Sequence, residues 1–223
     1  MAIGNVPFGQ YKVLDKSYDK HNFYIHDYFF AKTIDKVRPG GVIAFITSKG
    51  TMDKANPAVR KYISQRAELL GAIRLPNDAF KNAGTSVTSD IIFLKKREAY
   101  LDIDEDWIHL GTDENEIEMN SYFIENPHMV LGKMEMVSGP HGMESACVPE
   151  SGISLADRLR QAVQMIRGEI SVDDTEISDE ELEDESIPAE AGVKKFLLLF
   201  SKWKNILQGK LNNASTGHSG KNS

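Results

Sequence analysis

Residues 39–48 read Pro39-Gly40-Gly41-Val42-Ile43-Ala44-Phe45-Ile46-Thr47-Ser48, a continuous apolar run between two glycines and two small hydroxyl residues. A strand that is buried on both faces of a sheet has this pattern, because neither of its faces meets water. Before it, residues 21–37 carry apolar side chains at helical spacing, and Pro39 stops that pattern. The sequence therefore predicts a buried strand that is preceded by a crossover helix.

The flanking segments continue this alternation of helices and strands. Residues 56–66 begin with Asn and Pro, a capping residue and a first-turn proline, and predict a second helix. Residues 69–75 and 91–94 are apolar runs that predict two more strands. With a first strand ending near residue 5, this order predicts an α/β fold, the second half of an open, doubly wound Rossmann-like sheet, followed by irregular and helical extensions.

The end of the predicted first strand carries a short motif, Asn5-Val6-Pro7-Phe8. The side-chain oxygen of Asn5 can accept a hydrogen bond from an exocyclic amine, and the carbonyl of Pro7 can accept the second amine proton. Phe8 can stack on a base that has left its helix. Taken alone, the motif favours a Pro-containing turn with Phe8 in the core, although a site for a flipped base explains the same residues.

Longer stretches of the chain resemble one family. They are GNVPFGQYKV (4–13), HDYFFAKTIDKVRPGGVIAFITSKGTMDK (26–54), NPAVRKYISQRAELLGAIRLPNDAFKNAGTSVTSDIIFLKKR (56–97), NPHMVLGKM (126–134) and SGPHGMES (138–145). The sequence resembles adenine-specific DNA methyltransferase domains of the type I restriction-modification kind, above all those fused to DEAD/DEAH-like helicases in large proteins of mobile elements. The family motif is usually Asn-Pro-Pro followed by Phe or Tyr, so Val6 departs from it while Asn5, Pro7 and Phe8 match.

The resemblance implies an activity and an incomplete site. Asn5, Pro7 and Phe8 would be the catalytic residues that hold a flipped DNA adenine for methylation at N6, with S-adenosyl-L-methionine as the methyl donor. In such enzymes the glycine-rich turn for this donor precedes the motif, and the glycines at 40, 41 and 50 lack its spacing. We therefore expect the C-terminal half of a methyltransferase, inactive alone and without the donor site. Its partners would be DNA and an upstream methyltransferase half or helicase segment, in the same or another polypeptide.

Charge is unevenly distributed along the chain. Residues 1–98 hold 16 Lys and Arg against 9 Asp and Glu, whereas residues 99–168 hold 4 against 13. A basic surface suits contact with phosphates, although it is equally compatible with simple solvation. The long loop at 76–88 is either a target-strand contact or a connection without a ligand. The candidate substrate-binding residues are Tyr11, Lys49, Lys81, Asn82 and Thr85, and further phosphate contacts are Lys54, Arg60, Lys61 and Arg74.

The amino-acid composition bears on disulfides, metal sites and cellular location. A single cysteine, Cys147, cannot form an internal disulfide, and the scattered histidines give no metal-ligand spacing, so we expect no metal. No run of 18 apolar residues is present, which predicts a cytoplasmic protein without a membrane partner. His26 and Asp27 are expected to be a surface or core-edge pair rather than a catalytic dyad, because adjacent helical residues point apart.

Composition also divides the chain into four segments. Residues 1–100 form the methyltransferase part, and residues 101–168 a turn-rich extension ending in an amphipathic helix capped by Ser154. Residues 169–193 hold eleven acids and no base, which predicts a disordered acidic linker. Residues 194–223 form a basic tail, either an amphipathic helix for a membrane surface or partner, or an out-of-frame translation.

The sequence is consistent with two functions from different classes. The first is a catalytic fragment of an adenine-specific DNA methyltransferase. The second is a non-catalytic remnant or DNA-docking module of a helicase and methylase assembly, in which the motif is inherited but idle. An exposed, unpaired sheet edge at residues 2–5 would favour the second function.

Overall fold

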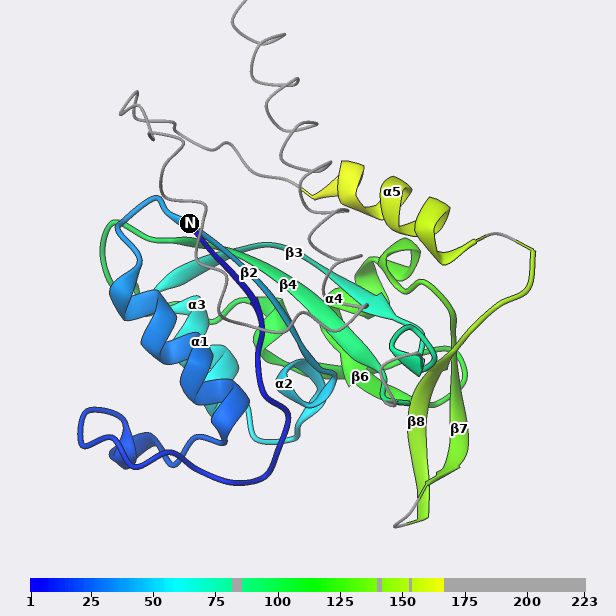
Figure 1. Ribbon diagram of the computed structural model, residues 1–223, viewed down its shortest axis with the longest axis horizontal. Helices are drawn as coiled ribbons and strands as arrows, with labels where there is room; N and C mark the ends of the chain where they lie inside the picture. The colour runs from blue at the N-terminus through cyan, green and yellow to red at the C-terminus, as the bar shows by residue number, and fades with distance from the viewer. Residues whose placement is uncertain (82–85, 140–141, 153, 167–223) are drawn as a thin grey trace, which may run out of the picture. The chain divides into compact units, whose positions relative to one another are not determined.

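A computed structural model describes residues 1–81, 86–139, 142–152 and 154–166 (Figure 1). Its centre is a mixed four-stranded sheet of order β1-β2-β4-β3. β2 pairs in parallel with β1 and antiparallel with β4, and β4 is antiparallel to β3 as well. The strands are β1 (Ala2–Asn5), β2 (Val42–Ser48), β3 (Ala67–Leu75) and β4 (Ser89–Lys96).

One edge of this sheet is important for the candidate site. Because β1, β2 and β3 all run against β4, their C-terminal ends lie at the edge where β4 begins. We call this the carboxyl edge, and it is formed by Asn5, Ser48, Leu75 and Ser89. Ligands of open α/β sheets bind outside the carboxyl ends of the strands.

Three helices accompany the sheet: α1 (Ile25–Lys36), α2 (Gly50–Asp53) and α3 (Ala58–Ser64). α1 connects the parallel strands β1 and β2, and its Phe30 ring packs edge-on against Phe45 of β2 at 5.3 Å between centroids. The predicted crossover helix is confirmed, but it begins at Ile25 rather than residue 21. A 3-10 turn, η1 (Asp19–His21), and the left-handed backbone of Asn22 change the chain direction before it.

Residues after the sheet form small elements instead of irregular chain. They are η3 (Asp106–Ile108), β5 (Leu110–Thr112), β6 (Glu118–Asn120), α4 (Ser121–Glu125), η4 (Pro127–Met129), β7 (Lys133–Gly139) and β8 (Gly142–Val148). The expectation of irregular chain is wrong for β7 and β8, because these two strands pair antiparallel; residues 140 and 141 between them lie outside the described residues. η3 leads directly into β5, which pairs with β6.

The last described element is α5 (Leu155–Met165). The predicted cap is confirmed, since the Ser154 hydroxyl accepts a hydrogen bond from the backbone N–H of Asp157 at 3.2 Å. The acidic linker (169–193) and the basic tail (194–223) lie outside the described residues. The α/β class is confirmed, and within the described part of the chain no helix is long and apolar enough to cross a bilayer.

Candidate functional site

The carboxyl edge places the Asn5 motif at the point where β1 leaves the sheet. Asn5 lies opposite Ile46 of β2, and the Val6 N–H donates to the Ile46 carbonyl at 3.0 Å. Val6 is buried, whereas Asn5 and Pro7 are exposed and Phe8 is half-buried. An accessible amide therefore lies beside an exposed proline and an aromatic ring.

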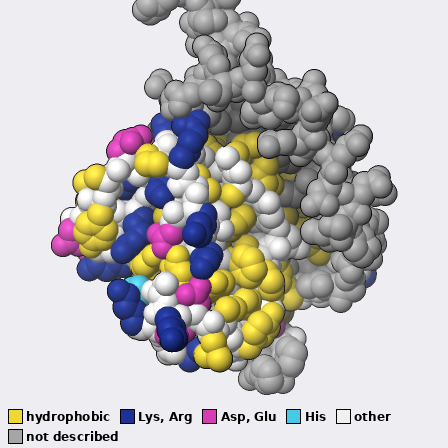
Figure 2. All heavy atoms as spheres, turned by 60° about the vertical axis from the view of Figure 1, so that its left-hand side comes forward, with side chains coloured by type: hydrophobic (Ala, Val, Ile, Leu, Met, Phe, Trp, Pro, Cys, Tyr) yellow, Lys and Arg dark blue, Asp and Glu magenta, His cyan; other side chains and the backbone are white. Residues whose placement is uncertain are grey.

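The residues after the motif return the chain to α1. The Tyr11 carbonyl accepts a hydrogen bond from the backbone N–H of Ile25 at 2.9 Å. The Tyr11 ring covers Gly9, where a Cβ atom would lie only 2.5 Å from the ring, and 57% of Tyr11 is exposed. We call residues 5–11 the motif loop. On the face of the molecule that carries α1, Figure 2 shows hydrophobic side chains beside Lys and Arg side chains.

A buried polar cluster lies at the first turn of α1. His26 and Asp27 are only 6% and 2% exposed, and His26 Nε2 lies 3.4 Å from Asp27 Oδ1. Lys54, directly after α2, forms an ion pair with the other oxygen of Asp27. The pair expected at the surface or at the edge of the core is therefore buried. Adjacency in a helix does not reveal which turn of the helix is covered, so no local pattern predicts this burial.

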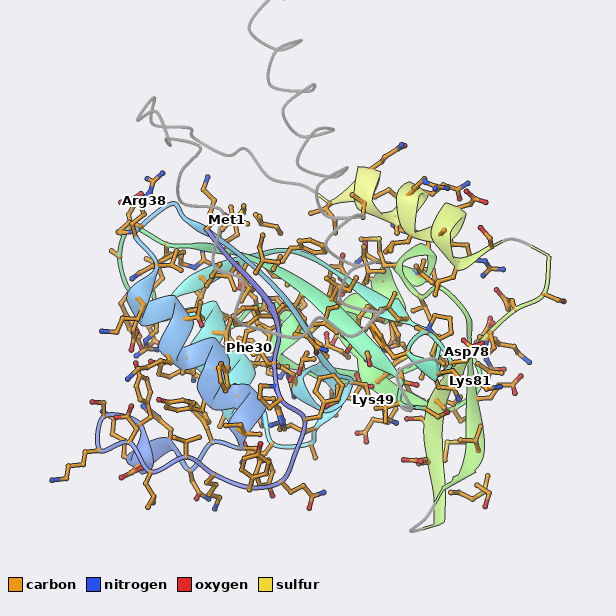
Figure 3. All side chains as sticks on the ribbon, viewed as in Figure 1. Met1, Phe30, Arg38, Lys49, Asp78 and Lys81 are labelled. Carbon is orange, nitrogen blue, oxygen red and sulfur yellow. The ribbon has the colours of Figure 1, made fainter. Side chains whose placement is uncertain are left out.

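Lys49, predicted to bind substrate, follows β2 at the carboxyl edge (Figure 3). Its ammonium group donates to the carbonyl and to the hydroxyl of Ser145, the latter at 2.7 Å. Burial lowers the pKa of Lys49, with Arg74 acting in the same direction and Asp53 opposing. Its charge thus anchors β8 to the sheet edge.

Lys81 is exposed and lies in a turn after β3, where its backbone N–H donates to the Asp78 carbonyl (Figure 3). Three strand spacings separate β1 from β3, or about 14 Å across the sheet. Lys81 is therefore at the same edge as Asn5 but on the opposite flank. The other two predicted loop residues, Asn82 and Thr85, lie outside the described residues.

Two of the basic residues expected to contact phosphates are buried instead. Arg60 is 1% exposed and donates to the carbonyls of Ile108 at 2.6 Å and Lys54 at 2.8 Å. Arg74 is fully buried and makes a bidentate pair with Asp90, with a further bond to Asp53 at 2.8 Å. Both predictions are wrong, because position near a strand end does not distinguish a buried structural arginine from an exposed one.

The charge state of this interior follows from its geometry. Burial alone would lower the pKa of Arg74, but Asp90 and Asp53 raise it above its ordinary value, so the guanidinium stays charged. The Arg74 guanidinium also lies 4.2 Å from the centre of the Phe123 ring. Burial raises the pKa of Cys147 to about 12, which keeps its thiol protonated. Among the described residues, no group of three His, Cys, Asp or Glu side chains could hold a metal ion.

The described residues do not form a site for S-adenosyl-L-methionine. Gly40 and Gly41 precede β2, at the opposite edge of the sheet from Asn5. Gly50 opens α2, a helix of four residues, and no second glycine in the spacing of a donor-binding turn accompanies it. No chemical step is therefore assigned to the donor on these residues.

Comparison with known proteins places this geometry in a family. The model of the family described as N-6 DNA methylase matches residues 4–125, which include the end of β1 with its motif and all of β2, β3 and β4. The chain belongs to the N-6 DNA methylase family. This N-6 DNA methylase family member carries Asn5, Pro7 and Phe8 at the end of its first strand.

Two known proteins are similar to this family member. Defense against restriction protein B of Escherichia phage P1 is 34% identical over 102 residues, which cover 44% of this chain and 4% of that protein. A solved structure that describes complex assembly and conformational transition of the type I R-M system shares 16% identity, with a TM-score of 0.35. That alignment covers 98% of this chain and 45% of the other. The chain therefore spans less than half of either relative.

Proposed function

We propose that this chain holds a flipped adenine of DNA for methylation at N6. The Asn5 side-chain oxygen and the Pro7 carbonyl accept the two amine hydrogens, and Phe8 stacks on the base. A base must leave its stack before chemistry at its exocyclic amine, and stacking with edge hydrogen bonds is how such pockets hold it. Membership of the N-6 DNA methylase family supports the reaction class.

The exposure of Asn5 beside a buried neighbour is the main support for this role. Asn5 is exposed at the carboxyl edge while its neighbour Val6 is buried and bonded to β2. The backbone that presents Asn5 is therefore fixed, and the amide itself is free to meet a ligand. Pro7 and Phe8 follow at once, so an amide, a carbonyl and a ring are available within four residues.

We further propose that the donor-binding half pairs with the outer edge of β1 and completes a doubly wound sheet. Among the described residues, β1 pairs only with β2, so its other edge presents unpaired backbone groups. Such an edge is a template for a further strand. The strand would come from an upstream methyltransferase segment or from another polypeptide of a helicase-containing assembly.

The base-holding role can be tested with the full chain and no methyl donor. Fluorescence anisotropy would measure binding to labelled duplexes that contain one unpaired adenine or one unpaired thymine, since an unpaired base costs least to extrude. We expect tighter binding to adenine and loss of that preference in Asn5→Ala, because one hydrogen bond to a ligand is worth about 1 kcal/mol or more.

Matched controls separate the site from the general surface. Asn115→Ala removes an exposed amide in the β5–β6 turn and should leave the preference intact. Phe8→Leu should weaken the binding of both duplexes by about tenfold, in line with the cost of losing base stacking. Phe29→Leu on α1 should leave the binding of both duplexes unchanged. An adenine preference that survives Asn5→Ala would overturn the proposal.

A second function is a DNA-docking module with an idle motif. The open edge of β1 and the missing donor turn favour it within the described residues. It predicts that the chain binds duplexes without regard to the unpaired base. In the same titration, Lys81→Gln would then weaken binding while Asn5→Ala and Phe8→Leu would not.

A further inference from the structure

The motif loop lies against a buried ionisable cluster that the proposed base contacts do not use. His26, Asp27 and Lys54 come from two different elements, and the two residues of α1 are almost fully buried. Burying charged and polar groups costs free energy unless they are paired. The burial of these groups beside an exposed candidate site therefore suggests that they have a role in that site.

Hydrogen bonding within the cluster is incomplete. Nδ1 of His26 makes no hydrogen bond to any described residue, and Nε2 faces Asp27. The remaining nitrogen of the ring is therefore available to the backbone of the motif loop. Buried polar atoms are satisfied in the great majority of cases, and an exception calls for a specific explanation.

Several contacts place the motif loop beside this ring. The Gly9 backbone lies close enough to the His26 ring to raise the pKa of His26, although burial lowers that pKa by more. A Cβ atom at Gly9 would lie 3.7 Å from Ile25, the residue before His26, and the Ile25 N–H donates to the Tyr11 carbonyl. The loop is thus held at its end, and Gly9 lies over the first turn of α1.

The other side of the cluster is rigid. Lys54 forms its ion pair with Asp27, and its own carbonyl accepts a hydrogen bond from the fully buried Arg60. The Lys54 ammonium also lies 5.5 Å from the centre of the Tyr24 ring. Asp27 cannot move without breaking these contacts, so His26 has a fixed neighbour.

We infer that His26 is a positioning residue for the motif loop. Its Nδ1 bonds the loop backbone at Gly9 when the base is bound, and Asp27 with Lys54 holds the ring in place. This contact fixes the path of the loop from Asn5 to Tyr11, so that Asn5, the Pro7 carbonyl and Phe8 converge on one base. The inference rests on the proposed function of the loop.

Two substitutions of His26 test its two ring nitrogens separately. His26→Asn keeps a polar group near the Nδ1 position, on the loop side, and His26→Gln keeps one near the Nε2 position, facing Asp27. Each variant of the full chain is titrated with the adenine and thymine bulge duplexes. Hydrogen exchange of residues 6–12 and thermal unfolding are measured in parallel, with His128→Asn on η4 as the exposed control.

We expect His26→Asn to keep the adenine preference within about twofold and to keep exchange of residues 6–12 slow. His26→Gln should lose at least about fivefold of that preference and exchange faster at residues 6–12, at a similar melting temperature. Equal behaviour of the two variants, whether both keep or both lose the preference, would overturn the inference. If Asn5→Ala itself has no effect, the proposed function fails instead.

Discussion

Arg74 is fully buried at the end of β3, and carboxylates from two other elements share its guanidinium. Asp90 comes from β4, and Asp53 from α2 also accepts the backbone N–H of Asn120 at 3.1 Å. The cluster therefore links the sheet, α2 and the segment that follows the sheet. Removing one member of a buried ion pair leaves the other without a partner, and this destabilises a fold far more than replacing both members by apolar residues.

Removing the cation alone should destabilise the fold strongly. We expect Arg74→Met to lower the free energy of unfolding by about 3 to 5 kcal/mol, because Asp90 is left buried without its cation. Arg74→Met with Asp90→Asn should cost less than the two single changes added together. Urea denaturation of the four proteins measures this coupling, and a cost below ~1 kcal/mol for Arg74→Met would contradict it.

His26 also gives the protein a pH-dependent stability. Burial lowers its pKa from 6.5, with Lys54 acting in the same direction and with Asp27 and the Gly9 backbone opposing. A histidine whose pKa is lower in the fold takes up its proton more readily when unfolded. Its contribution is therefore fully present above pH 6.5 and is lost as pH falls below that value.

The measurement compares urea denaturation at pH values of about 7.5 and about 5.5, on either side of the ordinary histidine pKa. Wild type should lose stability on acidification, and His26→Asn should lose less because the titrating ring is gone. His21, whose pKa is lowered by burial in the same direction, remains in both proteins. An identical change in the two proteins would show that His26 does not titrate in this range.

At the scale of elements, β3 and α5 meet at a glycine. The register of β3 against β4 shifts between Leu69 and Gly71, which marks a bulge. Gly71 has a φ of +154°, and a Cβ atom there would lie 2.7 Å from Ile166 and 3.1 Å from the Tyr122 hydroxyl. Only glycine combines this backbone with this close packing.

Gly71→Ala should therefore lower the free energy of unfolding by about 1 to 3 kcal/mol, through strain and displacement of Ile166. Gly50→Ala is the matched control, because its Cβ atom would meet only Ser48 at 3.5 Å and α2 tolerates alanine. Thermal unfolding of both variants tests the difference. Equal melting temperatures would show that the bulge carries no strain.

The whole molecule separates its charges along the chain. The first 98 residues carry an excess of basic residues, and residues 99–168 an excess of acids. The basic part contains the motif loop and Lys81, while the acidic part contains the β7–β8 hairpin. DNA should therefore meet the sheet-bearing part of the chain, and its phosphates should release counterions there.

Binding of a duplex should weaken steeply with salt. For about three phosphate contacts, affinity should fall roughly 40-fold between ~50 and ~200 mM salt. Lys81→Gln should reduce the slope of log affinity against log salt by about one. Lys133→Gln, paired with Glu135 on the hairpin, serves as the control. A slope unchanged by Lys81→Gln would remove Lys81 from the interface.

Sequence patterns predicted the elements that local chemistry specifies. The buried strand at 42–48, its preceding helix and the Ser154 cap were predicted because apolar runs, helical spacing and capping side chains act over a few residues. The β7–β8 hairpin was missed, since the glycines and proline at 139–142 favour turn-rich chain and the apolar residues Met136 and Met143 on its strands are exposed. The family motif at Asn5 was visible because it lies within four consecutive residues.

Short-range pattern in the sequence is enough to predict the α/β class and the order of the sheet-forming elements along the chain, and the family resemblance nominates the residues of the candidate site. The antiparallel position of β4 between β2 and β3 is visible only in the folded chain. The folded chain also shows that Arg60, Arg74, His26 and Asp27 are buried while Lys81 is exposed. Burial and ion pairing depend on residues far apart in the chain, such as Lys54 and Asp27, and no local sequence pattern indicates which residues will be in contact.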